Sequence, residues 1–549
     1  MKRSAYFVVF SSALIIIMLM EGETLGGRKR HEPGPTSVSV GQSYRIYPSG
    51  VTQTEPLIVR HPSNSNILFA SANTINFSTG FISEGVYVTT NGGQLWYGSD
   101  TCNGSPITFH HGDPGIAIDK DGRFHLVRLG PEFSPGIYAH FSANNGTAWS
   151  SQRTLQQEFV DRGTVTSDVD MSSSFFGRTY AAWIWLNQPY PVVCVFTTDG
   201  GQTWTAPAQV NNPAPRSLGA EITTGPNGTV NICWARVISI SPFTEDFVGF
   251  ASSTNGGASW TVLENAFDMN GIAGTFPSKG NIRVNGLPRI DTDKTGGPRN
   301  GWIYIATAQR NLSPAGSDPD IILNRSTNGG VTWSSGIRVN QDAVSNSKFQ
   351  YFPAIHVDDS GGVNVLYYDD RNTTSDSSGV YLSRSTDGGN TWNDYQISDH
   401  HFRPQPIGGL GQGYQGDNIG LTSVGDTLWP VWMDNSSGIY QIWTCPVDIS
   451  SLGTFVDELA APGTFILRQN YPNPFNPSTS IQYELLRNDV VTLEVFDMKG
   501  SRVAKLVSGK QNVGQHTARF SGEGLASGIY IYRLVGAGFS ETRKMVLLR

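Results

Sequence analysis

Acidic side chains stand at corresponding places in several segments of this chain, each just ahead of an apolar run typical of a β-strand. They are Glu55, Asp113, Asp168, Glu221 and Asp417, and two further segments carry Pro288 and Pro353 at the same place. Arginines and more acids follow the next strand-like run of these segments, namely Arg128, Arg236, Arg310, Asp369, Asp370, Arg371 and Asp434. Carboxyl groups held close together raise one another's pKa, so that one stays protonated while another is ionised. Such a set of acids, with arginines that can bind a carboxylate through two parallel hydrogen bonds, suits the hydrolysis of glycosidic bonds.

A short repeated motif indicates how these residues are brought together. The pattern Ser/Thr-x-Asp/Asn-x-Gly-x-x-Trp, called the box below, occurs six times and ends at Trp96, Trp149, Trp204, Trp260, Trp333 and Trp392. Successive copies lie 53 to 73 residues apart, which is the length of a four-stranded antiparallel sheet and too long for a helical repeat. The Asx and Gly residues supply the tight hairpin, and the Trp begins the returning strand. The repeats therefore predict an all-β propeller.

The number of blades follows from counting these units. Each box is preceded by further strand-like runs, so that one unit has three strands, the box and a fourth strand. A seventh unit, with DNIGLTSVGDTLWPVWMD and GIYQIWTCPV, has three strands and no box. Residues 37–48, SVSVGQSYRIYP, are expected to add its outer strand and to close the ring, because closure removes an open sheet edge. We predict seven blades; the alternative is six blades, with one unit merged or placed on the rim.

The propeller architecture predicts where the charged residues meet. The innermost strand of each blade starts at the face where the second strand ends, so side chains at those two places converge around the central opening. We expect the functional site on that face. The alternative is structural, since Asp and Glu also cap turns and a repeat copies a structural residue into every unit.

The six boxes closely resemble the Asp-boxes of the sialidase-like propellers, also called BNR repeats, in which they lie away from the active site. The resemblance implies a glycoside hydrolase of the exo-sialidase kind, with a Tyr paired with a Glu as nucleophile, an Asp as acid/base and three arginines on the sugar carboxylate. Glu221, in GAEI, resembles the family's Glu in position. Tyr351 and Tyr414, each just ahead of a first strand, could stand in for the nucleophile, and Arg236, Arg310 and Arg371 could form the arginine cluster. The family's Arg-Ile-Pro motif has no counterpart, because PLIVRHP places Arg60 at the far end of its strand.

These considerations define the candidate residues. The catalytic candidates are Asp113, Glu221, Tyr351, Tyr414 and Asp417, and the substrate-binding candidates are Arg236, Arg310, Asp369, Asp370, Arg371 and Asp434. The first hypothesis is an exported propeller that engages an extracellular glycan or glycoprotein and is a candidate hydrolase; the second is a non-catalytic adhesion or scaffold propeller at the cell surface. No cofactor and no metal are expected. His110 and His111 could bind a metal with Asp113, but adjacent residues of an extended chain point to opposite sides.

Composition restricts the partners. The formal net charge of −7, with only 38 Lys and Arg, argues against nucleic acid or an anionic membrane surface. Residues 1–27 have the basic start, apolar run and small polar end of a secretory signal peptide, with an uncleaved anchor as the alternative, and no other segment is long and apolar enough to span a bilayer. The four cysteines match no metal-ligand spacing; export permits disulfides, and their pairing stays open.

The last part of the chain has a different pattern. After the predicted propeller, residues 28–450, comes a linker, residues 451–465, and then residues 466–549 predict a small β-sandwich. YPNPFNP, VFDMKGSRV and ASGIYIYRL, with the basic and apolar end KMVLLR, closely resemble the type A C-terminal sorting domain of the type IX secretion system. The resemblance implies interaction with that secretion machinery and a location outside, or on the outer-membrane surface of, a Gram-negative bacterium. The alternative is an ordinary appended sandwich that binds a partner.

Overall fold

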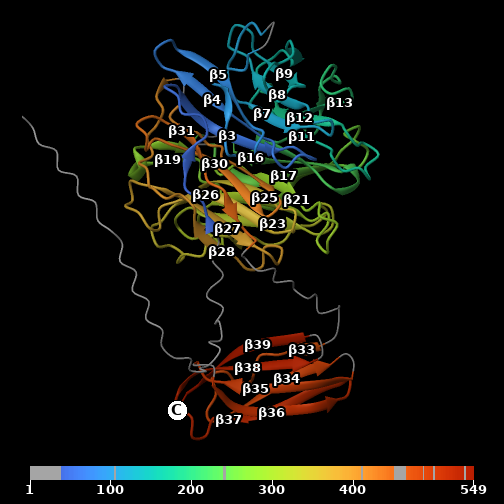
Figure 1. The fold of residues 1–549 in the computed structure, drawn as a ribbon, viewed down its shortest axis with the longest axis vertical. Coiled ribbons are helices and arrows are strands. Elements are labelled where there is room, and N and C mark those ends of the chain that lie inside the picture. The colour runs from blue at the N-terminus through green and yellow to red at the C-terminus, as the bar shows by residue number, and fades with distance from the viewer. Residues whose placement is uncertain are drawn as a thin grey trace, which may run out of the picture. The chain divides into compact units, whose positions relative to one another are not determined.

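The structure is a computed structural model that describes residues 39–103, 107–238, 241, 243–409, 412–450, 465–485, 488–498, 501–536 and 539–548. The predicted signal peptide, residues 1–27, lies outside the described residues, as does the predicted linker apart from its last residue. Regular structure in the described part is β-strand, with two short 3₁₀ turns, η1 (Pro226–Gly228) and η2 (Pro277–Lys279). None of these residues forms a helix with the length and hydropathy needed to cross a membrane. The chain is therefore all-β where it is described, as the boxes predict (Figure 1).

Residues 39–450 form successive antiparallel sheets with the same internal order. The first strands of these sheets are β3 (Thr52–Arg60), β7 (Gly115–Ile118), β11 (Thr164–Ser167), β15 (Ser217–Thr224), β21 (Arg289–Thr292), β25 (Gln350–Val357) and β29 (Gly420–Val424). The second strands are β4 (Leu68–Asn76), β8 (Phe124–Leu129), β12 (Thr179–Ile184), β16 (Val230–Val237), β22 (Ile303–Gln309), β26 (Val363–Asp369) and β30 (Thr427–Asp434).

The outer half of each sheet continues the same meander. The third strands are β5 (Phe81–Thr89), β9 (Ile137–Ser142), β13 (Val192–Thr197), β17 (Glu245–Ser253), β23 (Asp320–Ser326), β27 (Gly379–Ser385) and β31 (Gln441–Thr444). The fourth strands are β6 (Tyr97–Ser99), β10 (Arg153–Gln156), β14 (Ala208–Gln209), β18 (Thr261–Asp268), β24 (Ile337–Arg338), β28 (Asn393–Gln396) and, for the last sheet, β2 (Tyr44–Arg45).

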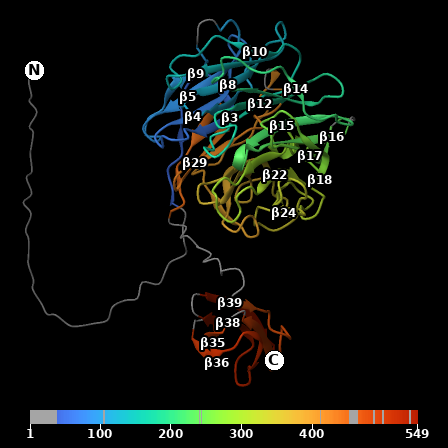
Figure 2. The same cartoon turned by 90° about the vertical axis from the view of Figure 1, so that its right-hand side faces the viewer.

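The first strands contact one another in a closed series. Each of them contacts the first strand of the next sheet, from β3 to β7 and onward to β29, and β29 contacts β3 again. In Figures 1 and 2 the early strand β3, in blue, accordingly lies beside β29 and β30, in orange. Sheets arranged around a common axis in this way form a β-propeller.

The two ends of the propeller segment meet in the last sheet. β2 pairs with β31 in the register Tyr44↔Thr444, and β1 (Ser39–Val40) pairs with β32 (Val447–Asp448). The segment before the first sheet thus adds the outer strand of the last sheet, as the sequence predicts. Two fully buried glutamines fasten this junction: the amide of Gln441 accepts from Ser49 N at 2.9 Å and donates to Val51 O at 2.7 Å, and Gln53 Oε1 accepts from Ile442 N at 3.1 Å.

The boxes form the turns between third and fourth strands. In the third sheet Thr197 Oγ1 accepts from Gly201 N at 3.0 Å, and Asp199 Oδ1 accepts from Thr203 N at 2.9 Å, so the two side chains hold the turn backbone. Gly201 has a φ of 86°, a conformation that favours glycine. Because successive strands are antiparallel, these turns lie on the face opposite to the one where the first strands begin. The boxes are therefore folding devices at a distance from that face.

Two inserted segments interrupt the regular meander. β19 (Gly274–Phe276), η2 and β20 (Ile282–Val284) form a hairpin before the fifth sheet, which explains the longest spacing between boxes. The hairpin is anchored by Lys279, whose buried ammonium group donates to Asp370 Oδ2 at 2.7 Å and to two backbone carbonyls. The other insertion is the segment before β29, and Arg283 N of the hairpin donates to Gly413 O of that segment at 2.8 Å.

The C-terminal part has two sheets. One contains β33 (Phe465–Leu467), β34 (Ser478–Leu485) and β37 (Gly514–Ser521); the other contains β36 (Arg502–Gln511), β35 (Asp489–Phe496), β38 (Gly528–Gly536) and β39 (Phe539–Leu547). Side chains of both sheets share one buried apolar cluster, which includes Ile481, Leu493, Phe520 and Tyr532.

The junction of the first and last sheets predicts a measurable dependence of stability on Gln441. Replacing Gln441 with Ala leaves Ser49 N and Val51 O without this partner, so the free energy of unfolding should fall by about 1–3 kcal/mol. The matched control is Gln157→Ala, at an exposed glutamine, which should change it by less than about 0.5 kcal/mol. Urea unfolding of both variants measures the difference, and equal effects would contradict the role given to this junction.

Candidate functional site

A cavity of about 370 Å³ opens on the face where the first strands begin, and we call it the central cavity. Charged side chains dominate its lining: the carboxyl groups of Glu55, Asp113, Asp161 and Asp417 and the guanidinium groups of Arg162, Arg216, Arg283 and Arg289. Asn73, Asn285, Asn418, His111 and Tyr414 also line it, and apolar side chains such as Leu129, Leu186 and Leu287 fill the spaces between them. The cavity therefore combines several acids with several cations in a confined space.

A backbone irregularity at the start of the first strands helps to place the acids. Glu55 and Asp113 have φ values of 56° and 50°, in the left-handed region that is uncommon for residues other than glycine. In β3 the pairing with β4 shifts by one residue between Thr54 and Leu57, and the same shift occurs in β15 and β25. Such bulges redirect side chains at strand ends, and strained residues of this kind gather at functional sites.

Asparagine amides bridge the carboxyl groups. Asn73, on β4, donates through Nδ2 to Glu55 Oε2 at 3.2 Å and to Asp113 Oδ1 at 2.8 Å, and its Oδ1 accepts from Asp113 N. Asn418 Nδ2 donates to Glu55 Oε2 at 3.3 Å and to Asp417 Oδ1 at 2.9 Å. Glu55, Asp113 and Asp417 are thus linked in one network through two amide groups.

Asp417 and Tyr414 bring in the inserted segments. Asn285, which follows the hairpin, donates through Nδ2 to Asp417 Oδ2 at 2.6 Å. Tyr414 lies 3.5 Å from the same amide, and the guanidinium carbon of Arg283 lies 4.6 Å from the centre of its ring. One wall of the central cavity is therefore built by insertions and not by the repeated strands.

Glu221 is held between two arginines. Its Oε1 accepts from Arg162 and, at 2.6 Å, from Arg289, while its Oε2 accepts from Thr164 Oγ1 at 3.1 Å. Burial alone would raise the pKa of Glu221, but the two guanidinium groups outweigh burial and hold the pKa below its usual value. Glu221 is an ionised group with both oxygens engaged, which orients Arg162 and Arg289 at the cavity wall.

The pKa values of the other acids of the cavity are raised instead of lowered. Burial, followed by the negative charges of Asp417 and Asp113, raises the pKa of Glu55 well above its usual value. Burial is also the main reason why the pKa of Asp113 is raised to about 6, and burial with the charge of Asp417 raises the pKa of Asp161. The network therefore holds two acids with raised pKa values, Glu55 with a pKa well above its usual value and Asp113 with a pKa of about 6.

Two arginines of the cavity differ from those that hold Glu221. Within the described residues no carboxylate lies within ion-pair distance of Arg216 or Arg283. Both are held by aromatic rings instead: Arg216 lies over Tyr190 and Phe243, at 4.8 and 5.2 Å, and Arg283 over Tyr414. The positive charges of these two arginines therefore line the cavity without a carboxylate of the described residues to neutralise them.

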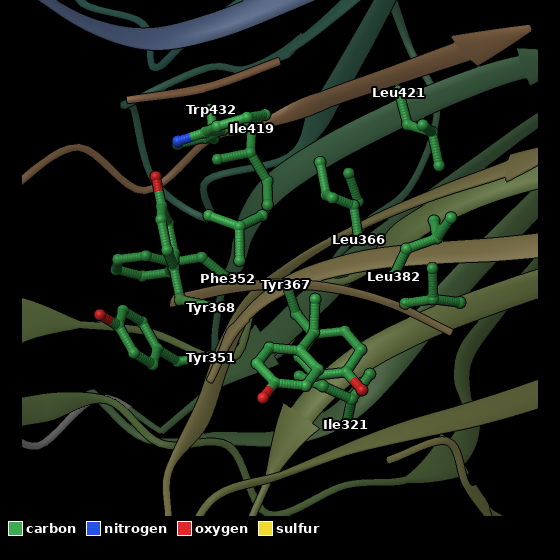
Figure 3. Close-up of a cluster of buried hydrophobic side chains, with 14 of the residues drawn as sticks. Ile321, Tyr351, Phe352, Leu366, Tyr367, Tyr368, Leu382, Ile419, Leu421 and Trp432 are labelled. Atoms are coloured by element: carbon green, nitrogen blue, oxygen red, sulfur yellow. The ribbon is translucent and has the colours of Figure 1, made fainter. Parts of the chain in front are cut away.

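Some of the predicted site residues meet at this cavity and others do not. Asp113, Tyr414 and Asp417 line it, and Glu221 stands behind two of its arginines. Tyr351 does not: its ring is fully buried, packs 5.2 Å from Tyr368 and bonds Ser378 at 2.9 Å (Figure 3). The expectation that Tyr351 reaches the site is corrected, because its ring packs in the apolar core against Phe276 of the inserted hairpin and against Phe352.

The residues at the ends of the second strands also fail to reach the central cavity. Arg236 pairs with Asp246 at 2.8 Å, Arg371 with Asp369 and Asp394, and Asp434 with His400 and Trp432. They lie one strand farther from the axis. Arg236 and Arg371 bond within their own sheets, and Asp434 bonds Trp432 of its own strand and His400 of the segment before β29, so these residues do not form the predicted ring. Arg310 and Asp370 line a second cavity.

The predicted start of the third sheet was also misplaced. Asp168 follows β11 rather than preceding it, and its carboxyl accepts from Ser173 Oγ. The strand is the short, polar segment Thr164–Ser167, so its position gives little signal, and the side chains that reach the cavity here are Asp161 and Arg162.

Other lining residues were not selected from the sequence as site residues. Glu55 could have been, since it precedes a proline at a first-strand start as Asp113 does. Arg289 directly follows Pro288 at the same place, so it also carried a signal. Arg216 lies in the connection before β15, and Arg283 lies in β20 of the inserted hairpin; the repeat gives no register for either place.

Comparison with known proteins identifies the C-terminal part. Residues 469–548 match the family described as the secretion system C-terminal sorting domain. The chain therefore carries a type IX sorting domain, and the protein is exported to the outer surface of a Gram-negative bacterium or beyond it. A search of curated proteins found no relative of the chain.

Solved structures with a similar fold are distant. An ulvan lyase bound to a GlcA-Rha3S repeat has 13% identity and a TM-score of 0.46, with 73% of this chain and 95% of that chain covered. An α-L-arabinanase of Penicillium chrysogenum has 13% identity and a TM-score of 0.41, covering 64% and 98%. A leech intramolecular trans-sialidase has 11% identity and a TM-score of 0.39, covering 65% and 70%. Function is therefore inferred from this chain's own residues.

The raised pKa of Asp113 predicts how stability depends on pH. Since the folded state holds this proton more tightly than the unfolded state, the contribution is present below about pH 4 and is lost as pH rises through about 6. Asp113→Asn should remove this loss of stability. The free energy of unfolding of the variant, relative to that of the wild type, should therefore be about 2–3 kcal/mol higher at pH 8 than at pH 4. Denaturant unfolding at both pH values measures this difference. Asp121→Asn, at an exposed carboxyl, is the control; a gain independent of pH would refute the assignment.

Proposed function

We propose that the central cavity hydrolyses a glycosidic bond of an extracellular glycan or glycoprotein. The observation that carries the proposal is the pair Glu55 and Asp113, whose carboxyl oxygens are hydrogen-bonded to one amide nitrogen and whose pKa values are both raised, that of Asp113 to about 6. Oxygens that share a donor in this way lie within about 6 Å of each other, close to the roughly 5–5.5 Å between the carboxyl groups of retaining glycosidases. The export of the chain, and the cations beside the pair, support the proposal.

We propose a role for each acid. Protonated Glu55 donates its proton to the glycosidic oxygen while the ionised carboxylate of Asp113 attacks the anomeric carbon, so that the C–O bond to the leaving group breaks and a glycosyl ester forms. The Glu55 carboxylate then takes a proton from water, and the hydroxide formed in that step cleaves the ester, releases the sugar and restores both groups. Asn73 fixes the two carboxyls relative to each other. Asp417, through its charge, keeps the proton on Glu55.

The architecture is part of the proposal. We propose that the seven sheets are the blades of a single seven-bladed propeller of the Asp-box type, with the sheet closed by β2 as its last blade, and that the two C-terminal sheets form a β-sandwich. The closed series of contacts among first strands and the shared apolar cluster support this. The proposed boundaries are those read from the sequence: a signal peptide at 1–27, the propeller at 28–450, a linker at 451–465 and the sorting domain at 466–549.

Substitution of the two acids tests the proposed reaction. Glu55→Gln and Asp113→Asn should each lower kcat/KM on a cleaved oligosaccharide by about 10²–10⁴-fold, because general acid and nucleophile are lost, while glycan binding is retained. The control Asp121→Asn should have wild-type activity, and NMR of the first product should show retention at the anomeric carbon. Binding on a glycan array without turnover of any sugar by the wild type would instead favour the adhesion or scaffold propeller.

The pH dependence of the reaction is a separate test. The kcat/KM should rise as pH increases through about 6, where Asp113 loses its proton, and should fall again at higher pH, where Glu55 ionises. Asp417→Asn removes a negative charge beside Glu55, so the descending limb should move to lower pH while the ascending limb moves less. A profile that is unchanged by this substitution would contradict the proposed coupling.

A further inference from the structure

A second cavity lies on the same side of the propeller, between the fifth and sixth sheets. Its volume is about 380 Å³, and it is lined by Ser278, Arg310, Ser317, Asp318, Pro319, Ser347, Phe349, Asp370 and Ser375. These residues come from the ends of β22 and β26, from the connections before β23 and β25, and from η2 of the inserted hairpin. The hairpin thus contributes Ser278 to this cavity and Arg283 to the central one.

The carboxyl group of Asp318 is unusual in this cavity. Asp318 is only 7% exposed. Its Oδ1 is buried and has no hydrogen-bond partner, while its Oδ2 accepts from Lys348 N at 3.2 Å. A buried carboxylate oxygen without a donor costs about 1–3 kcal/mol or more, so native proteins seldom retain one unless a ligand or water fills the place. This oxygen therefore marks the position of a missing hydrogen-bond donor.

The other charges of the cavity are balanced. Asp370 is neutralised by the buried ammonium group of Lys279, and its Oδ1 accepts from Phe349 N at 2.7 Å. Arg310 has no carboxylate at ion-pair distance within the described parts of the chain, and it lines the same cavity as Asp318, the acid with an unpartnered oxygen. The ammonium group of Lys348 lies outside the lining and donates to the backbone carbonyls of Asp370 and Thr373, at 3.0 and 2.8 Å. Among the lining residues one cation, Arg310, and one anion, Asp318, remain without an ion-pair partner, and a ligand with a net charge would leave one of them opposed.

We propose that this second cavity binds a neutral sugar unit, with Asp318 accepting from one hydroxyl and Arg310 donating to another. A hydroxyl both donates and accepts, so neighbouring hydroxyls of one ring satisfy a carboxylate and a guanidinium together. The hydroxyls of Ser278, Ser317, Ser347 and Ser375 add further partners of both kinds, and Phe349 supplies an apolar surface for the ring. The site is separate from the central cavity and does not depend on the reaction proposed there.

Calorimetric titration tests this inference on the full exported protein with Glu55→Gln as background, which prevents cleavage in the central cavity. The probes are the tetrasaccharides of cellulose, xylan and mannan, with tetragalacturonate as the acidic comparison. We expect at least one neutral probe to bind, and expect Asp318→Asn and Arg310→Gln each to weaken it about tenfold or more. The control Asp426→Asn, at an exposed carboxyl elsewhere, should leave affinity unchanged.

Thermal unfolding of each variant shows whether the protein remains folded. Asp318→Asn should keep the melting temperature of the background protein, because an amide of the same shape replaces a carboxylate that has one unpartnered oxygen. The inference is overturned if no neutral probe binds at millimolar concentration, if only the acidic probe binds, or if both folded variants bind as the background does. Failure of this inference can be distinguished from failure of the hydrolysis proposal, because hydrolysis is measured on the wild-type protein, in which Glu55 is intact.

Discussion

The contact of each first strand with the first strands of its neighbours is the constraint on which the site depends. Because this series closes, residues as far apart in sequence as Glu55, Asp113 and Asp417 lie within reach of shared amide groups. The boxes stabilise the turns on the opposite face, and the buried glutamines fasten the first sheet to the last. The rigid ring is what allows several like charges to be held together at one end.

The electrostatics of the site follow from that confinement. Four carboxyl groups and four guanidinium groups share a small cavity, but they are not paired one to one. Glu221 takes two arginines, and Glu55 and Asp113 are bridged by an uncharged amide instead. Neutral bridges leave burial and like charges to raise the pKa of these two acids. The same fold thus holds one glutamate whose pKa is lowered, Glu221, and one whose pKa is raised, Glu55, in a single site.

The sequence predicted the arrangement of the strands better than the positions of the side chains at the site. The boxes were sufficient to predict the propeller, and the missing fourth strand of the last unit was sufficient to predict the pairing of residues 44 and 45 with β31. Asp113 and Asp417, both predicted from the first-strand starts, line the central cavity. The prediction from the second-strand ends was wrong for Arg236, Arg371 and Asp434, which have hydrogen-bond partners in their own sheets. The periodicity of a sequence does not show which partner a side chain binds. Both Arg283 and Tyr351 depend on the inserted hairpin, which the repeat does not predict: Arg283 lies in it, and Tyr351 packs against its Phe276.

The central claim is that burial and the neighbouring charges of Asp113 and Asp417 keep the Glu55 carboxyl protonated. The direct measurement is an NMR titration of carboxyl carbon resonances in protein labelled at glutamate, with Glu55→Gln identifying the signal. The account predicts that the Glu55 carboxyl titrates with a midpoint well above the usual value for glutamate, and that Asp417→Asn lowers this midpoint. A Glu55 carboxyl already ionised at pH 5 would contradict it.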